Sequence, residues 1–158
     1  MASILTVDNL VGKTTANTIH IPGHVVQVQQ YYNAHTGHTT STSASFVASG
    51  VTKSITPKYS NSLILIQSNV TMAYSNQWFK TKMYLNGSPM TGAGDYHHGY
   101  IDNNHNGYSG ISFQGQHQAT STNTLTFEIY SALGTAGNTS YITHNQASAA
   151  ITLWEIAQ

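Results

Sequence analysis

Histidine is the one abundant residue type in this chain that could bind a metal, and the chain has nine histidines. Several neutral imidazoles can together bind a transition metal, above all where symmetry-related copies meet on an axis. The alternative is that they are polar loop residues in contact with water or a neighbouring subunit. The carboxylates close enough in sequence to orient them are Asp95 and Asp102. We expect no metal and no cofactor. The histidines considered are His35 and His38, which form a His-x-x-His motif, and His97, His98, His105 and His117.

The acidic residues could supply the pair of carboxylates that glycoside hydrolysis needs. Asp95 and Asp102 share one stretch rich in Gly and Asn, which offers little of the rigid support that a catalytic pair requires. The chain also lacks cysteine and a Gly-x-Ser-x-Gly turn for a nucleophile. We therefore expect no enzymatic activity, and a hydrolase acting on host glycans is the least favoured alternative. The acidic residues are Asp8, Asp95, Asp102, Glu128 and Glu155.

Charge is scarce along the whole chain. Charged residues make up 6% of the 158 residues and the formal net charge is +0, whereas about a quarter of an average domain is charged. No basic stripe is available for phosphates, so we expect no binding to nucleic acid. The start, MASILTVDNL, does not resemble a secretory signal. The densest apolar run, Leu63 to Ile66, is too short for membrane insertion. A neutral surface does not repel copies of itself, so the composition favours a component of an assembly.

Alternation with a period of two predicts a chain built from many short strands with frequent turns. This pattern indicates an all-β fold, an antiparallel sandwich of jelly-roll type or a barrel, and we favour the sandwich over residues 23–158. The expected strands are Val25–Tyr32, Ser43–Ala48, Val51–Thr56, Ser62–Tyr74, Gln77–Leu85, Tyr108–Gln114, Thr124–Ser131, Ser140–His144 and Ala149–Ile156.

Two of these strands are apolar on both faces. Ile64 and Ile66 share one face of the fourth strand with other apolar residues, yet Leu63 and Leu65 lie on the opposite face. A strand with two apolar faces needs two partners, and in a small sandwich the second is often another subunit. We therefore predict a homo-oligomer, and we favour a trimer. Its interface residues are Leu63, Leu65, Trp154 and Ile156.

Two further segments lack the strand pattern. Residues 1–22 are predicted to form an extended arm that docks on another protein, because their apolar residues are too sparse for a core. Those residues are Ile4, Leu5, Val7, Leu10 and Val11. The stretch Thr91 to Gly107 is predicted to be a long loop that contacts either a receptor glycan or adjacent copies. Its contact residues would be Tyr96, His97, His98, Tyr100, His105 and Tyr108.

Several motifs, taken in order, resemble the virion structural proteins of tailed phages that infect marine bacteria and cyanobacteria. A Ser/Thr-rich strand leads to a Ser-x-Thr-Pro turn, a Ser-x-Ile-Leu strand follows, and an Ile-Thr-Leu-x-Glu-Ile strand closes the chain. The stretches concerned are SILTVDNLVGKTTANTI followed by IPGHVVQV, STSASFVASGVTKSITP, SNSLILIQSNV and ITLWEIAQ.

This resemblance implies a β-sandwich particle protein, often homotrimeric, displayed on the head or on the tail fibres. It carries over no catalytic residue. We expect a capsid decoration (cement) protein on the exterior of the virion, made in the host cytoplasm, with itself and the major capsid protein as partners. The alternative is a tail-fibre or receptor-binding module that binds a host surface glycan through residues 91–107.

Overall fold

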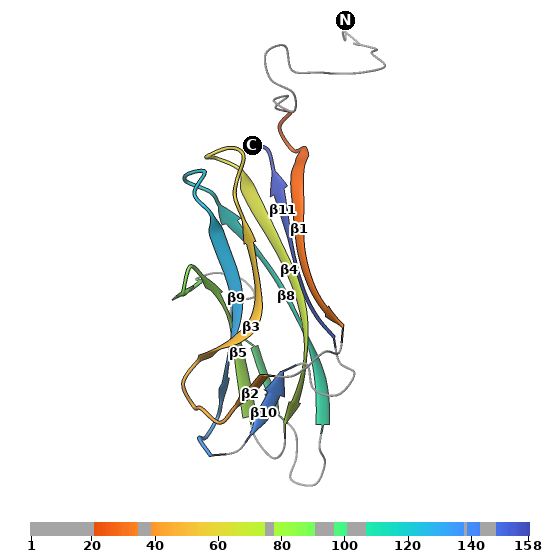
Figure 1. The fold of residues 1–158 in the computed structure, drawn as a ribbon, viewed down its shortest axis with the longest axis vertical. Helices are drawn as coiled ribbons and strands as arrows, with labels where there is room; N and C mark the ends of the chain where they lie inside the picture. Colours follow the sequence, from red (N-terminus) through yellow and green to blue (C-terminus); the bar gives the residue numbers. More distant parts are fainter. Residues whose placement is uncertain are drawn as a thin grey trace, which may run out of the picture.

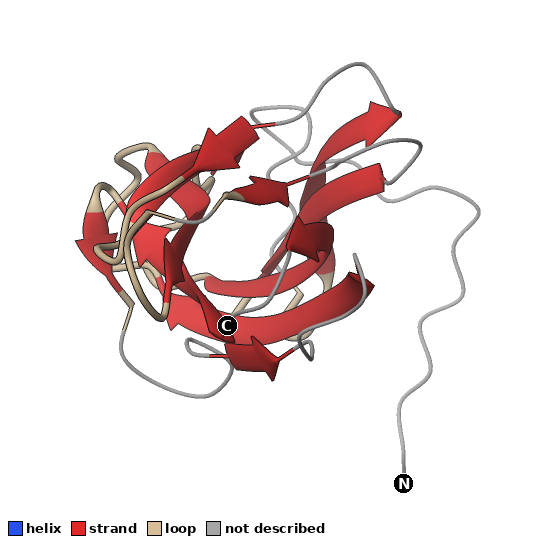
Figure 2. Ribbon diagram, turned by 90° about the horizontal axis from the view of Figure 1, so that it is seen from below, coloured by secondary structure: helices blue, strands red, loops and turns tan. Residues whose placement is uncertain are grey.

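The structure is a computed structural model that describes residues 21–34, 39–74, 78–90, 97–100, 107–137, 139–142 and 148–158. In these ranges all regular structure is β-strand, and Figure 2 shows strands and loops only. No helix in the described part of the chain could span a membrane. The strands are β1 (Val25–Ala34), β2 (Thr39–Ser41), β3 (Val47–Ile55), β4 (Leu63–Tyr74), β5 (Trp78–Leu85), β6 (Ser88–Pro89), β7 (His97–Tyr100), β8 (Gly107–Gln118), β9 (Leu125–Leu133), β10 (Ser140–Ile142) and β11 (Ser148–Ile156).

The strands form two antiparallel sheets that face each other (Figure 1). Sheet one has six strands: β1, β11 and β4 lie side by side, β8 pairs with β4, and β10 and β2 extend it. Sheet two has five strands: β3, β9 and β5 lie side by side, and β6 and β7 both pair with β5. The predicted all-β antiparallel sandwich is confirmed.

The order of pairing makes this sandwich a jelly roll. The first strand pairs with the last, β1 with β11, and the short strands β2 and β10 pair next in the same sheet. Further inward, β3 pairs with β9, β4 with β8 and β5 with β7. The pairs are therefore nested, as in one long hairpin rolled up so that its four longer pairs alternate between the two sheets. This is the double Greek-key arrangement of jelly rolls.

The core lies between the two sheets and follows the alternation along each strand. On β11, Ile151 and Leu153 are buried while Thr152 and Trp154 on the opposite side are partly exposed. Three phenylalanines fill the largest volumes, and aliphatic side chains from both sheets surround them. Those phenylalanines are Phe79, Phe113 and Phe127.

One glycine joins two segments that the sequence predicted as separate strands. Ser43–Ala48 and Val51–Thr56 were expected singly, but β3 runs continuously from Val47 to Ile55. Gly50, with φ 78°, sits where the β3–β9 register shifts, so it forms a bulge. The predicted Asn86-Gly87 turn is confirmed. Its two residues have φ 49° and 77° and join β5 to β6 as a hairpin.

The prediction of a single loop over Thr91 to Gly107 is wrong in two places. Residues His97–Tyr100 form β7, which pairs with Trp78–Thr81 of β5, and β8 already begins at Gly107. The free edge of β5 supplies the reason, since backbone pairing at an edge needs no apolar pattern in the added strand. Residues 91–96 and 101–106 lie outside the described residues.

Candidate assembly surface

The four residues predicted as an interface lie together on the outer side of sheet one. Leu65 on β4 is directly opposite Trp154 on β11, and Leu63 is directly opposite Ile156. Leu65 is 37% exposed, and the other three side chains are partly exposed. The inference from parity therefore placed these residues correctly on one surface, away from the core.

Strand β1 adds two valines to this surface. Val28 is opposite Trp154 and Val25 is opposite Ile156, so each lengthens a row that already crosses β11 and β4. Val25 is 43% exposed and Val28 49% exposed. The sequence reasoning missed both valines. Val28 and Tyr32 are four residues apart and so share a face of the strand, which is a signal that could have placed Val28. We call the following set the outer apolar face: Val25, Val28, Leu63, Leu65, Trp154 and Ile156.

A groove of about 390 Å³ runs within this face. Its apolar walls are Val25, Leu65, Trp154 and Ile156, and the side chains of Gln67 and Gln114 lie at its polar side. Toward the other end of the sheet most outward residues are amides and hydroxyls, together with Tyr32, Ala150 and Gly110. Among the described residues, none that points outward from sheet one is charged. A partner for this surface must therefore be recognised through apolar contact and neutral hydrogen bonds.

Glu155 links neighbouring segments by hydrogen bonds on the core side of sheet one, beneath the outer apolar face. It is fully buried on the core side of β11. Its Oε1 accepts hydrogen bonds from the backbone N–H of Lys58 (2.7 Å) and Tyr59 (3.2 Å) and from Ser62 Oγ (2.6 Å). Its Oε2 accepts one from Gln27 Nε2 (2.6 Å). These contacts tie β1 and the turn before β4 to β11, and so hold the walls of the groove in register.

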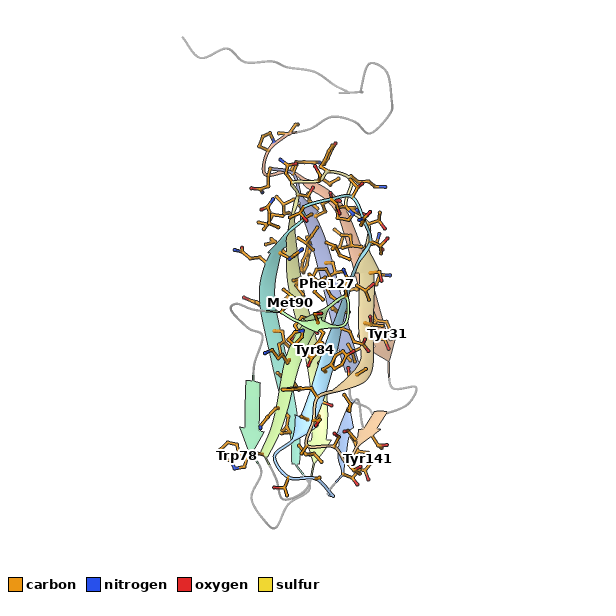
Figure 3. All side chains as sticks on the ribbon, turned by 90° about the vertical axis from the view of Figure 1, so that its left-hand side faces the viewer. Tyr31, Trp78, Tyr84, Met90, Phe127 and Tyr141 are labelled. Atoms are coloured by element: carbon orange, nitrogen blue, oxygen red, sulfur yellow. The ribbon has the colours of Figure 1, made fainter. Side chains whose placement is uncertain are left out.

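Charged and aromatic side chains gather instead on the outer side of sheet two. Lys80 and Lys82 follow each other on that side of β5, and Lys82 is opposite Tyr130. The ring of Tyr130 stacks on that of Tyr84 with centroids 3.7 Å apart. Tyr84 lies halfway along the face of sheet two that Figure 3 presents, and Trp78 lies near its lower end. The two outer faces of the sandwich thus differ in charge.

The structure does not assemble the histidines into a metal site within its described part. His117 on β8 is half-buried with its ring edge-on to Phe127 at 6.2 Å, and burial lowers its pKa. No group of three or more His, Cys, Asp or Glu residues able to hold a metal occurs among the described residues. The others considered fall on residues whose side chains or whole placement lie outside the description: His35, His38, His97, His98 and His105.

The two described acidic residues do not form a catalytic pair with each other. Glu155 is enclosed by its hydrogen-bond donors in sheet one. Glu128 lies on the outer side of sheet two, where its Oε1 accepts a hydrogen bond from the Gly50 N–H (3.3 Å). The other three, Asp8, Asp95 and Asp102, lie outside the described residues.

The remaining predicted contact residues are only partly placed. The backbones of His97, His98 and Tyr100 belong to β7 and that of Tyr108 to β8, which puts the first three beside β5. Tyr96 and His105 lie outside the described residues. The docking-arm residues do too: Ile4, Leu5, Val7, Leu10 and Val11.

Comparison with known proteins gives a distant similarity of fold. No family model and no curated protein matches the sequence. Among solved structures, the chain is similar to the VP2 subviral particle of infectious bursal disease virus, with 14% identity and a TM-score of 0.34. The alignment covers all of this chain but 42% of that one. The similarity to this virus capsid protein is therefore weak.

Proposed function

We propose that this protein is a structural component of a tailed-phage particle, a capsid decoration protein without enzymatic activity. It associates with copies of itself through the outer apolar face, most simply as a trimer, and it docks on the major capsid protein. This places it on the exterior of the virion. The observation that carries the proposal is the outer apolar face itself, which combines exposed aliphatic and indole groups with no charge in its described part.

Leaving the outer apolar face exposed to water costs free energy. Val25, Val28 and Leu65 each expose more than a third of their area, in adjoining rows around Trp154. Contiguous exposed apolar patches on a soluble protein mark interaction sites. Ordinary monomers are kept apart by surface charge, which a chain at net +0 with 6% charged residues largely lacks. Burial against another copy removes the apolar area from water without stranding a charge.

Trp154→Ala tests self-association directly. Truncating a buried tryptophan at the centre of an interface costs about 2 kcal/mol or more, which is roughly a 30-fold weaker association constant. We expect the wild-type chain to sediment as an oligomer at micromolar concentration and the variant to dissociate. Trp78→Ala is the matched control, because Trp78 is 53% exposed and lies on sheet two. A wild-type chain that sediments as a monomer at these concentrations contradicts the proposal.

Particle imaging tests the location. A label on this chain should appear in a regular array over the capsid, and released protein should rebind to capsids that lack it. A label at the tail, or specific binding of a host glycan without its hydrolysis, would replace the decoration role with the tail-fibre or receptor-binding alternative. Hydrolysis of a host glycan would overturn both.

A further inference from the structure

We infer that the groove in the outer apolar face receives the N-terminal arm of a second copy of this chain, so that copies are joined by arm exchange. The inference rests on the proposed self-association and adds what occupies the surface. Three observations carry it: where the described chain begins, how many residues precede that point, and how their chemistry compares with that of the groove.

The described chain begins beside the groove. Ile21, which is 49% exposed, opens a tight turn in which the His24 N–H donates to the Ile21 carbonyl (3.0 Å). Gly23 has φ 81°, which suits the third position of a type II turn after Pro22. The turn is tied to the chain end, since the Gly23 N–H donates to the Ala157 carbonyl (2.7 Å). Val25 and Ile156, which pair with each other at this end of β1 and β11, line the groove. Figure 1 shows the start of β1 beside the end of β11.

The chain preceding Ile21 is long enough to reach a neighbour. Its apolar residues end at Val11, apart from Ile19, so a largely polar stretch of residues 12–20 connects them to the fixed turn. Nine residues can span about 30 Å when extended. Because the turn and the groove lie at the same end of sheet one, an arm of this reach can leave its own sandwich toward the same end of a copy packed beside it.

The arm and the groove also match in chemistry. Residues 4–7 read Ile-Leu-Thr-Val and carry no charge, which is what an uncharged groove with apolar walls requires. An extended segment leaves backbone N–H and C=O groups unpaired. The side-chain amides of Gln67 and Gln114 at the polar side of the groove can both donate and accept hydrogen bonds to such groups.

If copies exchange arms, a single kind of contact is enough to build the assembly. Each copy carries one arm and one groove, which are different surfaces, so the contact is heterologous and repeats head to tail. Such a contact closes into a ring when the rotation allows it, and a trimer is one closed solution. An arm that filled the groove of its own chain would instead cover the surface on which the proposed self-association depends.

A cross-linking experiment on the full chain tests the occupant, and it is clean because the chain has no cysteine. We expect the double variant Leu5→Cys/Leu65→Cys to form, on mild oxidation, covalent multiples of the 17.1 kDa chain up to the closed ring. Leu5→Cys paired with Ser54→Cys is the matched control, since Ser54 is exposed on sheet two, and should give no ladder. Thiols consumed without any gain in mass would show that each arm binds its own groove. Thiols left unreacted would show that the arm binds elsewhere. Either result overturns the inference.

Sedimentation separates this inference from the proposed function. The arm variant Leu5→Ser/Leu10→Ser and the groove variant Trp154→Ala should each dissociate the oligomer by at least tenfold in association constant. Mixed in equal amounts, they should form a heterodimer, because the first still offers a groove and the second an arm. If the arm variant remains fully oligomeric while Trp154→Ala dissociates, self-association through the face stands and arm exchange fails. If wild type is monomeric, the proposed function fails first.

Discussion

Glu155 stands on the core side of β11, where its neighbours two residues apart, Leu153 and Ala157, are apolar and buried. Burying a carboxylate that has no hydrogen-bond partners costs free energy. Here two backbone N–H groups, a hydroxyl and a side-chain amide all donate to it. Every one of these partners is a donor, so the site is built for an acceptor with two oxygens. The sequence pattern could not predict donors that lie about a hundred positions away in the chain.

Glu155→Gln should therefore destabilise the fold although it keeps the size of the side chain. The amide replaces one acceptor oxygen with an NH₂ group that faces another donor, and a buried group left without a partner costs about 1–3 kcal/mol. Denaturant unfolding should show a loss of about 2 kcal/mol. Glu128→Gln is the matched control and should change stability by less than about 0.5 kcal/mol, since that carboxylate accepts one bond at the surface. Equal losses in the two variants would count against this account.

His117 should make stability depend on pH. Burial lowers its pKa below the ordinary histidine value of 6.5, so the folded state binds a proton less readily than the unfolded chain. Above pH 6.5 the imidazole is neutral in both states and its contribution is fully present. As the pH falls through 6.5 the unfolded state takes up the proton first, and stability declines until the folded state is protonated as well. His117→Phe should flatten this part of the stability profile against pH. A profile unchanged by the substitution would refute the assignment.

Strand β3 shows how one residue reshapes an element. Gly50 adopts φ 78°, a region that costs a residue with a side chain about 1–2 kcal/mol. The bulge it forms shifts the register on β9 between Ala48 and Thr52 and brings the Gly50 N–H to Glu128. Without the bulge, the alternation of inward and outward residues in the first half of β3 would not match that in the second half. The alternation in the sequence therefore breaks at this point and predicts two strands instead of one.

Gly50→Ala should lower the free energy of unfolding by about 1 kcal/mol, because alanine strains the bulge. Gly110→Ala on β8 is the matched control: a Cβ there meets no atom within 4 Å and the backbone is not in the left-handed region. That substitution should be neutral or slightly stabilising, since it reduces the freedom of the unfolded chain. Thermal unfolding of both variants measures the difference, and a control as damaging as Gly50→Ala would show that the bulge is not the cause.

The sequence predicted those strands in which apolar and polar residues alternate over enough positions to bury one face. β4, β9 and β11 were predicted within two residues of their bounds, and so was the second apolar face that Leu65 and Trp154 share. β7 was missed because its pairing with β5 uses backbone groups and leaves no periodic trace. The groove was also beyond sequence reasoning, since it depends on β1 lying beside β11 and on β8 lying beside β4.

At the scale of the whole molecule, charge is confined to places other than the outer apolar face. Among the described residues Lys80, Lys82 and Glu128 belong to the outer side of sheet two. An assembly made through the opposite face gains its free energy from apolar area and uncharged hydrogen bonds. Charge pairs at a surface are screened over about 8 Å at physiological ionic strength, whereas those contacts are not.

Attachment to the particle should therefore survive molar NaCl with little loss, and a chelator should not release the protein. Occupancy measured by gel densitometry of washed particles against salt concentration checks both expectations. A steep fall between low and high salt would show that the lysines or acids hold the protein in place, and the docking account would then be wrong.

The nesting of strand pairs also determines the order in which the strands can pair during synthesis. β11 lies in the middle of sheet one, between β1 and β4, yet it is the last strand to leave the ribosome. Residues 25–34 must wait for residues 148–156, so the roll closes only after β11 has been made, and pairing this distant in sequence is slow. Trp154 and Ile156 are supplied by that same strand. The arm is thus made before its proposed acceptor, which keeps a nascent chain from receiving an arm before β11 has joined its own fold.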